Sequence, residues 1–182
     1  LSLEAMKMET HVAADRDAEV EAVHVAAGDS GAAEDIRQHG LTFHPLDIDR
    51  RSAGPLAAWR LMRAMRRLMR HVDPQIVHLV TIKPVLLGGL AARWCGVAHV
   101  VAAVSGLGFV FTARGLAATG RRQAVSVLYR LALARPGVQV IFQNTDDRAV
   151  LQRHACIGDE QVVMIRGSGV DLDHWVAQPV PA

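Results

Sequence analysis

The sequence predicts an α/β protein with a doubly wound, Rossmann-like parallel sheet. Short apolar, β-branched runs alternate with helical segments, which is the pattern of consecutive βαβ units. Most of these runs lead through a turn into a helix start, as in sheets whose loops gather at one edge. A length of 182 residues suits one domain with its own core. The predicted strands cover residues 19–27, 41–46, 76–81, 97–104, 138–143 and 161–166, and the predicted helices cover 31–39, 56–71, 84–94, 119–135 and 145–154.

The first elements depend on alternation and on helix boundary signals. Residues 19–27 alternate well enough between polar and apolar side chains to predict a strand. Ser30 is placed to cap the helix that follows, and Gly40 is placed to end it. The helix over residues 56–71 is strongly amphipathic, and Asp73-Pro74 ends it because the residue before a proline avoids the helical conformation.

The later elements are a regular succession of apolar runs and helices. The run from Ile76 to Thr81 is typical of a buried parallel strand. Pro84 stands near the first position of the next helix, where the missing N–H costs little. Pro136 and Gly137 end the helix over residues 119–135 and lead into the strand that begins at Val138.

Composition narrows the classes of function. Hydrophobic residues make up 51% and charged residues 21%, which is typical of a globular rather than a disordered chain. Aromatic residues are only 4%, so a stacking surface for single-stranded nucleic acid is not expected. No apolar run is long enough to cross a membrane. Cys95 and Cys156 form no metal-ligand spacing, and His78, within a predicted strand, is expected to be buried; the default setting is a reducing cytoplasm.

The charges are segregated along the chain. Residues 50–135 carry 14 basic residues against a single acidic one, Asp73, while the segments before and after are acidic. An anionic partner that bears phosphate or lipid head groups would suit this middle segment. The alternative is a solvated surface that the acidic flanks neutralise in the folded protein.

The basic helix over residues 56–71 is predicted to contact an anionic membrane surface. Its apolar face is narrow and rich in methionine, comprising Leu61, Met65, Leu68 and Met69, and its other face is arginine. A helix that covers the sheet and turns its arginines outward would have the same pattern, so this alternative stays open. DNA binding is disfavoured because no docking motif surrounds the helix. The predicted membrane-surface residues are Arg60, Arg63, Arg66, Arg67 and Arg70.

Two loops at predicted strand ends are candidates for binding a phosphate-bearing acceptor. Thr81 and Lys83 lie between a strand and a helix N-terminus, whose free N–H groups and dipole favour an anion; a simple surface lysine is the alternative. The next loop starts like a dinucleotide fingerprint but has Phe111 in place of the third glycine, which argues against a nicotinamide or flavin site. Its glycines still allow a close backbone approach, or simply form a tight turn. The predicted acceptor-binding residues are Thr81, Lys83, Gly106, Gly108 and Phe109.

A third loop follows the last predicted strand. It is rich in glycine and in backbone N–H groups, so it is equally compatible with a hinge and with a binding loop on the donor side. Its residues are Arg166, Gly167, Ser168, Gly169 and Asp171.

Taken together, these segments resemble the N-terminal half of family 4 glycosyltransferases of the GT-B architecture, closest to the branch that makes capsule, exopolysaccharide and lipid-linked oligosaccharide. Their order and spacing match over about three quarters of the chain. The segments that carry the resemblance are Gly40–Leu46 followed by Asp49–Arg51, Pro74–Pro84, Val104–Phe111, Val140–Asp147 and Ile165–Leu172.

The resemblance implies an acceptor-side domain over residues 20–175. Such a domain receives a lipid-linked or saccharide acceptor at the inner membrane face, and a second domain binds the nucleotide sugar, of UDP-sugar type, without a metal. The family's opening strand is lacking, so the N-terminal strand region is expected to be irregular or incomplete. Residues 176–182 resemble the start of the interdomain linker, and the chain stops before the donor domain's E-x7-E motif. We therefore expect a cytoplasmic, peripheral domain that is inactive alone, and no catalytic residue is identified in it.

The N-terminal segment resembles something else. Leu3–Glu9 is similar to the biotin-attachment motif of biotin-dependent carboxylases, with Lys7 at the modified position, and this similarity extends over residues 1–29. Residues 1–19 are therefore predicted to be a biotinyl-like remnant or a non-native segment. Ala18 stands where the carrier has a glycine, and the carrier's preceding half is missing. A biotin carrier fragment is the alternative function.

Overall fold

The protein is an α/β fold in which every paired strand is parallel to its neighbour, as a computed structural model shows. The structure describes residues 24–27, 33–46, 54–104, 106–107, 116–155 and 157–165. Four strands form one sheet in the order β3-β4-β5-β6, and two form a second sheet, β1-β2. The predicted fold class is confirmed. The strands are β1 (His24–Ala27), β2 (Thr42–Pro45), β3 (Ile76–Val80), β4 (His99–Val104), β5 (Val138–Phe142) and β6 (Val162–Met164).

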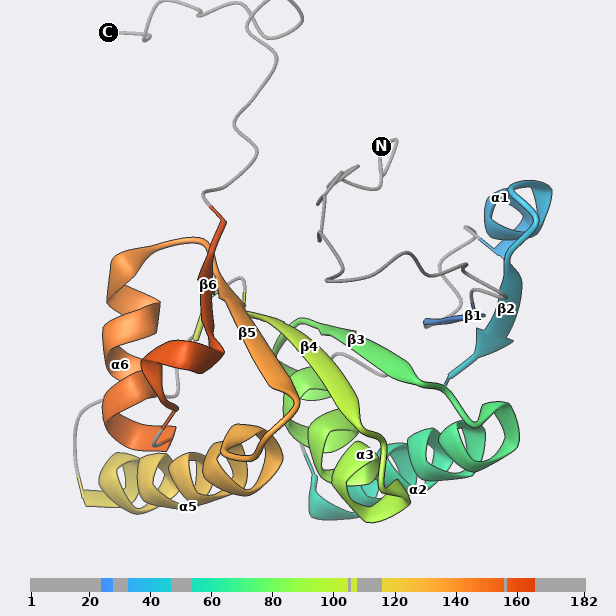
Figure 1. The fold of residues 1–182 in the computed structure, drawn as a ribbon. Coiled ribbons are helices and arrows are strands. Elements are labelled where there is room, and N and C mark those ends of the chain that lie inside the picture. Colours follow the sequence, from blue (N-terminus) through green and yellow to red (C-terminus); the bar gives the residue numbers. More distant parts are fainter. Residues whose placement is uncertain are drawn as a thin grey trace, which may run out of the picture.

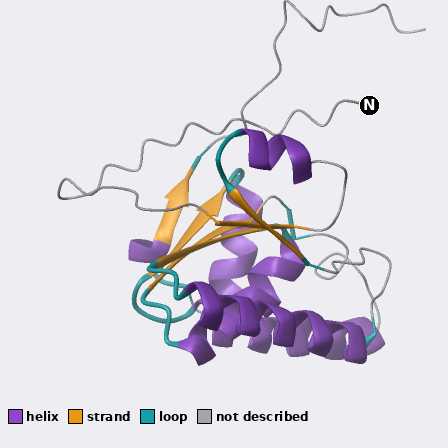
Figure 2. Ribbon diagram, turned by 90° about the vertical axis from the view of Figure 1, so that its right-hand side faces the viewer, coloured by secondary structure: helices purple, strands orange, loops and turns teal. Residues whose placement is uncertain are grey.

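The helices form a layer against the larger sheet. Figure 1 shows α2, α3 and α5 together beneath the strands, while α1 lies beside the smaller sheet, and the view turned by 90° shows most helices on one side of the strands (Figure 2). Most boundaries agree with the sequence prediction to within a few residues. The helices are α1 (Ala33–Gln38), α2 (Pro55–Val72), α3 (Gly89–Cys95), α5 (Leu116–Leu133) and α6 (Thr145–Ala155), with a π-helical turn η1 (Pro84–Gly88) and a 3₁₀ turn η2 (Asp159–Gln161).

The apolar face of α2 is part of the core. Leu61, Met65 and Met69 recur along one side of the helix and are buried, and the helix packs against η1 and α3. Burying a side chain of this size contributes about 1.5–3 kcal/mol, so this packing is a main reason that α2 is helical and fixed in place. The apolar face of α2 is therefore occupied by packing within the chain.

The segment predicted as one helix over residues 84–94 begins instead with the π-helical turn η1. Two consecutive glycines let this segment come close to its neighbours. A Cβ atom on Gly88 would lie 2.7 Å from Leu79 Cδ2, and one on Gly89 would lie 2.9 Å from Ala132 Cβ. Because real Cβ atoms do not approach so closely, side chains here would push the segment away from β3 and α5.

Among the described residues, β3 is an edge strand of the larger sheet. The doubly wound order 3-2-1-4-5-6 places a central strand between the positions that β1 and β3 occupy here. Within the described ranges, no strand is hydrogen-bonded to both β1 and β3. Ile76, His78 and Val80 alternate along β3 and therefore point to the same face of the sheet, where Ile76 and Val80 are 63% and 48% exposed, whereas Leu79 on the opposite face is buried against η1. The prediction that His78 is buried was wrong because it lies on the exposed face. Desolvation lowers the pKa of His78.

Candidate functional site

The carboxyl ends of β3, β4 and β5 lie at one edge of the sheet. The strands are in register there, with Val80 beside Ala103 and Val104 beside Phe142. The loop after each strand therefore emerges at the same edge, where open parallel sheets bind their ligands. The described loop residues at this edge are Thr81 and Lys83 after β3, Gly106 and Leu107 after β4, and Asn144 and Asp147 after β5.

Thr81 has an unusual backbone conformation directly after β3. Its φ is +73°, in the left-handed region that a β-branched residue rarely adopts. Its carbonyl oxygen accepts the N–H of Val85 at 3.0 Å, so the turn that starts the next helical segment holds it there. Lys83 is half-buried within this turn. Strained residues of this kind cluster at binding and catalytic sites, which supports the loop as a candidate.

The loop after β4 is held in place by α6. Gly106 has a φ of +128°, which favours glycine, and there is open space where a side chain would stand. Leu107 is buried, and its N–H donates to Asp147 Oδ1 at 3.3 Å. The glycine that the sequence prediction singled out is therefore required by the backbone and lies at the same sheet edge as Thr81.

Asn144 and Asp147 were missed as site residues by the sequence analysis. Asn144 Oδ1 accepts the Asp147 N–H at 2.8 Å and Asn144 Nδ2 donates to Asp147 Oδ2 at 2.8 Å, which caps the start of α6. The signal was an Asn-x-x-Asp spacing after an apolar strand, typical of a capped helix start. Asp147 also lies near Tyr129 of α5, and burial together with this carboxylate raises the pKa of Tyr129. Asp147 thus links α5, α6 and the loop after β4.

The structure brings together only part of the predicted site. Thr81, Lys83 and Gly106 share the carboxyl edge of β3 and β4, as predicted, but their role in binding an acceptor stays a prediction. The remaining predicted positions lie outside the described residues: Gly108 and Phe109, the loop of Arg166, Gly167, Ser168, Gly169 and Asp171, and the biotin position Lys7.

The outer surface of α2 carries the predicted arginines. Arg60, Arg63, Arg67 and Arg70 are exposed and Arg66 is half-buried. Leu61, Met65 and Met69 face the core, so the apolar face of α2 is used in packing, and the role of the arginines at a membrane surface stays a prediction. The arginine side instead carries its own exposed apolar groups, Leu56 and Trp59, with Trp94 of α3 beside it.

Two arginine–tryptophan contacts organise this surface. The Arg63 guanidinium lies 5.2 Å from the ring centre of Trp59, and that of Arg66 lies 5.9 Å from that of Trp94. The sequences of α2, η1, α3 and α5 contain no Asp or Glu. The ion pairs found between described residues, Arg37–Glu34 and Arg148–Asp159, lie on other elements. We call the outer surface of α2 and α3 the arginine face.

The described residues contain neither a membrane-spanning helix nor a metal-binding cluster. No helix among them has the length and apolarity needed to cross a membrane. In the same part of the chain, no group of three or more His, Cys, Asp and Glu side chains is arranged to hold a metal ion.

A doubly wound α/β domain whose polar loops meet at the carboxyl edge of its strands belongs to the Rossmann-like class of ligand-binding domains. Residues 10–145 match the model of the family described as "Glycosyl transferase 4-like". The chain therefore belongs to this glycosyltransferase family, and the predicted resemblance is confirmed.

The proteins that are similar to this chain include a curated enzyme and two proteins of known structure. The relative is the N,N'-diacetylbacillosaminyl-diphospho-undecaprenol alpha-1,3-N-acetylgalactosaminyltransferase of Campylobacter jejuni, 23% identical over 137 residues that cover 75% of this chain and 36% of that enzyme. A glycosyltransferase from Rickettsia africae is 14% identical with a TM-score of 0.57, over 85% of this chain and 37% of that one. MurG of Acinetobacter baumannii is 17% identical with a TM-score of 0.49, over 82% and 37%.

These comparisons indicate the fold of the chain and the share of each relative's length that it spans. The similarity to the Rickettsia africae structure supports the fold of a glycosyltransferase domain. The chain spans about 36–37% of the length of the relatives that it matches. Family and fold together are those of a transferase.

Proposed function

We propose that this chain is the acceptor-side domain of a glycosyltransferase that moves a sugar from a nucleotide sugar to a lipid-linked acceptor for polysaccharide or lipid-linked oligosaccharide synthesis. Membership of the glycosyltransferase family supports the reaction class. The name of the Campylobacter jejuni relative, an enzyme that acts on a diphospho-undecaprenol compound, supports an acceptor that carries a diphosphate. The donor, of UDP-sugar type, would be held by a second domain.

The carboxyl edge of β3 and β4 is where we place the acceptor's diphosphate. The observation that carries this proposal is the convergence of a lysine, a helical N-terminus and a positive-φ glycine at neighbouring strand ends. Lys83 would offset the negative charge of the diphosphate. The backbone near Gly106 would approach the phosphate oxygens closely, because no side chain stands in the way. The strained backbone at Thr81 would fix the position of the lysine loop.

Binding of a short polyprenyl diphosphate to the purified chain tests this placement. We expect geranylgeranyl diphosphate to bind, and Lys83→Ala to weaken binding at least tenfold, because a hydrogen bond to a charged group contributes about 1.5–3 kcal/mol. Lys83→Arg keeps the charge and should retain most of the affinity. Arg153→Ala, on the exposed end of α6, is the matched control. If Lys83→Ala leaves the affinity unchanged, the proposed position of the diphosphate is wrong, even though the chain belongs to the glycosyltransferase family.

We also propose that the domain lies on the inner face of the cell membrane through the arginine face. Arginines suit lipid phosphates, and tryptophans such as Trp59 and Trp94 suit the boundary between head groups and acyl chains. Each basic residue near an anionic surface contributes about 1 kcal/mol, and salt screens this attraction. This docking uses the outer side of α2 rather than its buried apolar face.

Co-sedimentation with vesicles of phosphatidylcholine and phosphatidylglycerol tests the docking. The double reversal Arg63→Glu/Arg67→Glu should reduce binding more than tenfold. The reversal Arg37→Glu/Arg153→Glu changes the net charge equally but lies on α1 and α6, so it should have a much smaller effect. Equal losses in both variants would show that only net charge matters and would refute the arginine face.

A further inference from the structure

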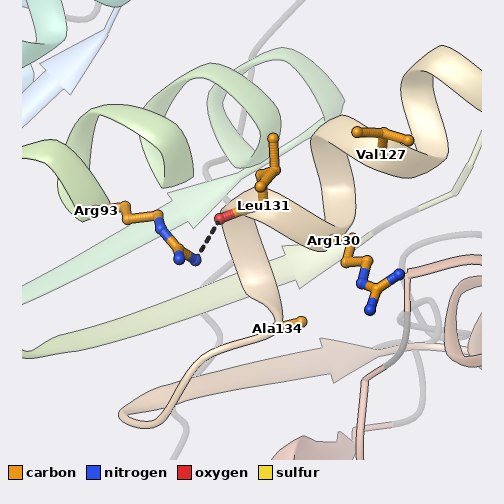
Figure 3. Close-up of a pocket in the computed structure, with 5 residues that line it drawn as sticks. All are labelled: Arg93, Val127, Arg130, Leu131 and Ala134. Carbon is orange, nitrogen blue, oxygen red and sulfur yellow. Dashed lines mark hydrogen bonds between the residues drawn. The ribbon is translucent and has the colours of Figure 1, made fainter.

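A groove separates α3 from the outer side of α5, on the opposite side of α3 from α2. Its volume is about 500 Å³, within the range of small-molecule sites. One wall is Arg93 of α3, and the other is formed by four positions that recur on one face at the C-terminal end of α5 (Figure 3). The α5 wall comprises Val127, Arg130, Leu131 and Ala134.

The floor of this groove is apolar and incompletely covered. Val127 is 55% exposed and Leu131 is 45% exposed, although both are large aliphatic side chains. The opposite face of the same helix packs into the core, where Tyr129, Ala132 and Leu133 are buried. Packing among the described residues therefore accounts for the inner face of α5 but not for the apolar side chains in the groove.

The rim of the groove is positively charged. Arg93 donates from Nη1 to the Leu131 carbonyl oxygen at 3.1 Å, which fixes its guanidinium at the groove (Figure 3). Arg130 is exposed and forms no ion pair with another described residue. No Asp or Glu occurs in η1, α3 or α5 to balance these charges.

A third arginine, Arg135, adds positive charge near the groove. Arg135 directly follows the groove residue Ala134 and donates from Nη1 to the Val97 carbonyl at 3.0 Å. Its Nε and Nη2 are buried and have no hydrogen-bond partner. Burial and the nearby Arg93 guanidinium lower its pKa, which reflects repulsion between the two cations. An anion at the groove would relieve this repulsion.

We propose that the groove between α3 and α5 binds the head group of an anionic phospholipid. Arg93 and Arg130 hold the phosphate, and the glycerol and first acyl methylenes lie on Val127, Leu131 and Ala134. An apolar floor beneath a cationic rim matches a phosphate that carries a hydrocarbon, whereas inorganic phosphate would leave the floor exposed to water. Arg93 of the groove is followed directly by Trp94, whose ring lies against Arg66 of α2 on the arginine face. It lies among the helices rather than at the loops of β3 and β4, and does not depend on the proposed transfer reaction.

A soluble short-chain lipid tests this site without the surface effects of a vesicle. Trp94, next to Arg93, becomes the single tryptophan reporter when Trp59 and Trp175 are replaced by phenylalanine. Dihexanoyl-phosphatidylglycerol, kept below its micelle concentration, should cause a saturable change in Trp94 fluorescence. Dihexanoyl-phosphatidylcholine and inorganic phosphate should each bind at least tenfold more weakly, because the first lacks net charge and the second lacks the apolar part.

Variants separate the rim from the floor. Arg130→Gln should weaken phosphatidylglycerol binding at least tenfold without disturbing the fold, since Arg130 is exposed and the Arg93 contact to Leu131 is kept. Val127→Ser should weaken lipid binding but leave the weak phosphate response unchanged. Arg121→Gln, an exposed arginine of the same helix outside the groove, is the matched control and should bind normally.

Four outcomes would overturn the proposal. They are the absence of a saturable response, a normal affinity in Arg130→Gln, inorganic phosphate that binds as tightly as the lipid, and a glutamate-rich peptide that competes as well as the lipid. The third would indicate a site for a free anion, and the fourth a docking site for an acidic protein segment.

Discussion

Gln161 connects three parts of the fold through one buried amide group. Its Nε2 donates to the carbonyl oxygens of Leu133 and Arg135 at 3.0 Å each and of Val138 at 3.2 Å. These acceptors belong to the end of α5, the following loop and the start of β5. We expect Gln161→Leu to keep the side-chain volume but to remove this donor from all three carbonyls, of which that of Leu133 still accepts the Arg135 N–H at 2.8 Å.

The expected loss of stability follows from this count of acceptors. Two of the three bonds are buried, those to Leu133 and Val138, and of these two acceptors Val138 depends more on Gln161 because Leu133 keeps the Arg135 N–H. A buried acceptor without a partner costs about 1–3 kcal/mol, so the free energy of unfolding should fall by about 1–3 kcal/mol. With a urea m-value of about 2 kcal/mol/M, the midpoint should fall by about 0.5–1.5 M.

Urea denaturation followed by circular dichroism measures this change. Gln139→Leu is the matched control, because Gln139 also joins β5 to η2, but by an exposed bond to the Glu160 carbonyl at 3.3 Å. The control should change the free energy of unfolding by less than about 0.5 kcal/mol. A change in Gln161→Leu as small as that of the control would refute the reasoning that the buried acceptors depend on this side chain.

Three further predictions concern activity, pH and the N-terminal segment. The purified chain should transfer no sugar from a UDP-sugar, because it spans about a third of its relatives' length; measurable product would contradict this. Desolvation and the neighbouring His24 and His71 hold the pKa of His44 in the folded protein below its usual value of 6.5. As the pH falls below about 6.5, the unfolded chain therefore binds a proton at His44 more readily than the folded protein does, and the free energy of unfolding falls. Amide protection in β1 and β2 should therefore be lower at pH 5 than at pH 7.5, and His44→Gln should reduce the difference; equal protection at both pH values would refute the link. Co-expression with a biotin ligase should give no streptavidin signal, because the resemblance covers one half of a carrier; a signal lost in Lys7→Arg would favour the alternative function.

Much of the fold could be predicted because local patterns and tertiary packing agree. The prediction of a helix over residues 56–71 is close to the observed Pro55–Val72, since its apolar spacing is also the spacing that packs on α3. The strand predicted at 138–143 is observed at Val138–Phe142, where a buried apolar run follows the turn at Gly137. In such segments the apolar residues that make the sequence periodic are the same residues that are buried in the fold.

The errors arise where the neighbour of an element decides its environment. The sequence of β3 is typical of a buried strand, but burial of its side chains needs cover on both faces of the sheet, and sequence periodicity does not show which faces are covered. The apolar face of α2 fits a membrane and a sheet equally well, and only its contacts with η1 and α3 distinguish them. The π-helical turn at Pro84–Gly88 and the bonds of Gln161 depend on long-range contacts and leave no periodic signal.

The exposed edge of β3 has a consequence for work with the purified protein. The strand is apolar, has no proline or lysine, exposes Ile76 and Val80, and pairs along its outer edge with no strand among the described residues. Natural edge strands usually carry charges, prolines or bulges that prevent pairing with another chain. β3 has no such charge or proline, so we expect copies of the domain to associate edge to edge as their concentration rises. Light scattering over a dilution series would report this association, and Ile76→Lys should suppress it.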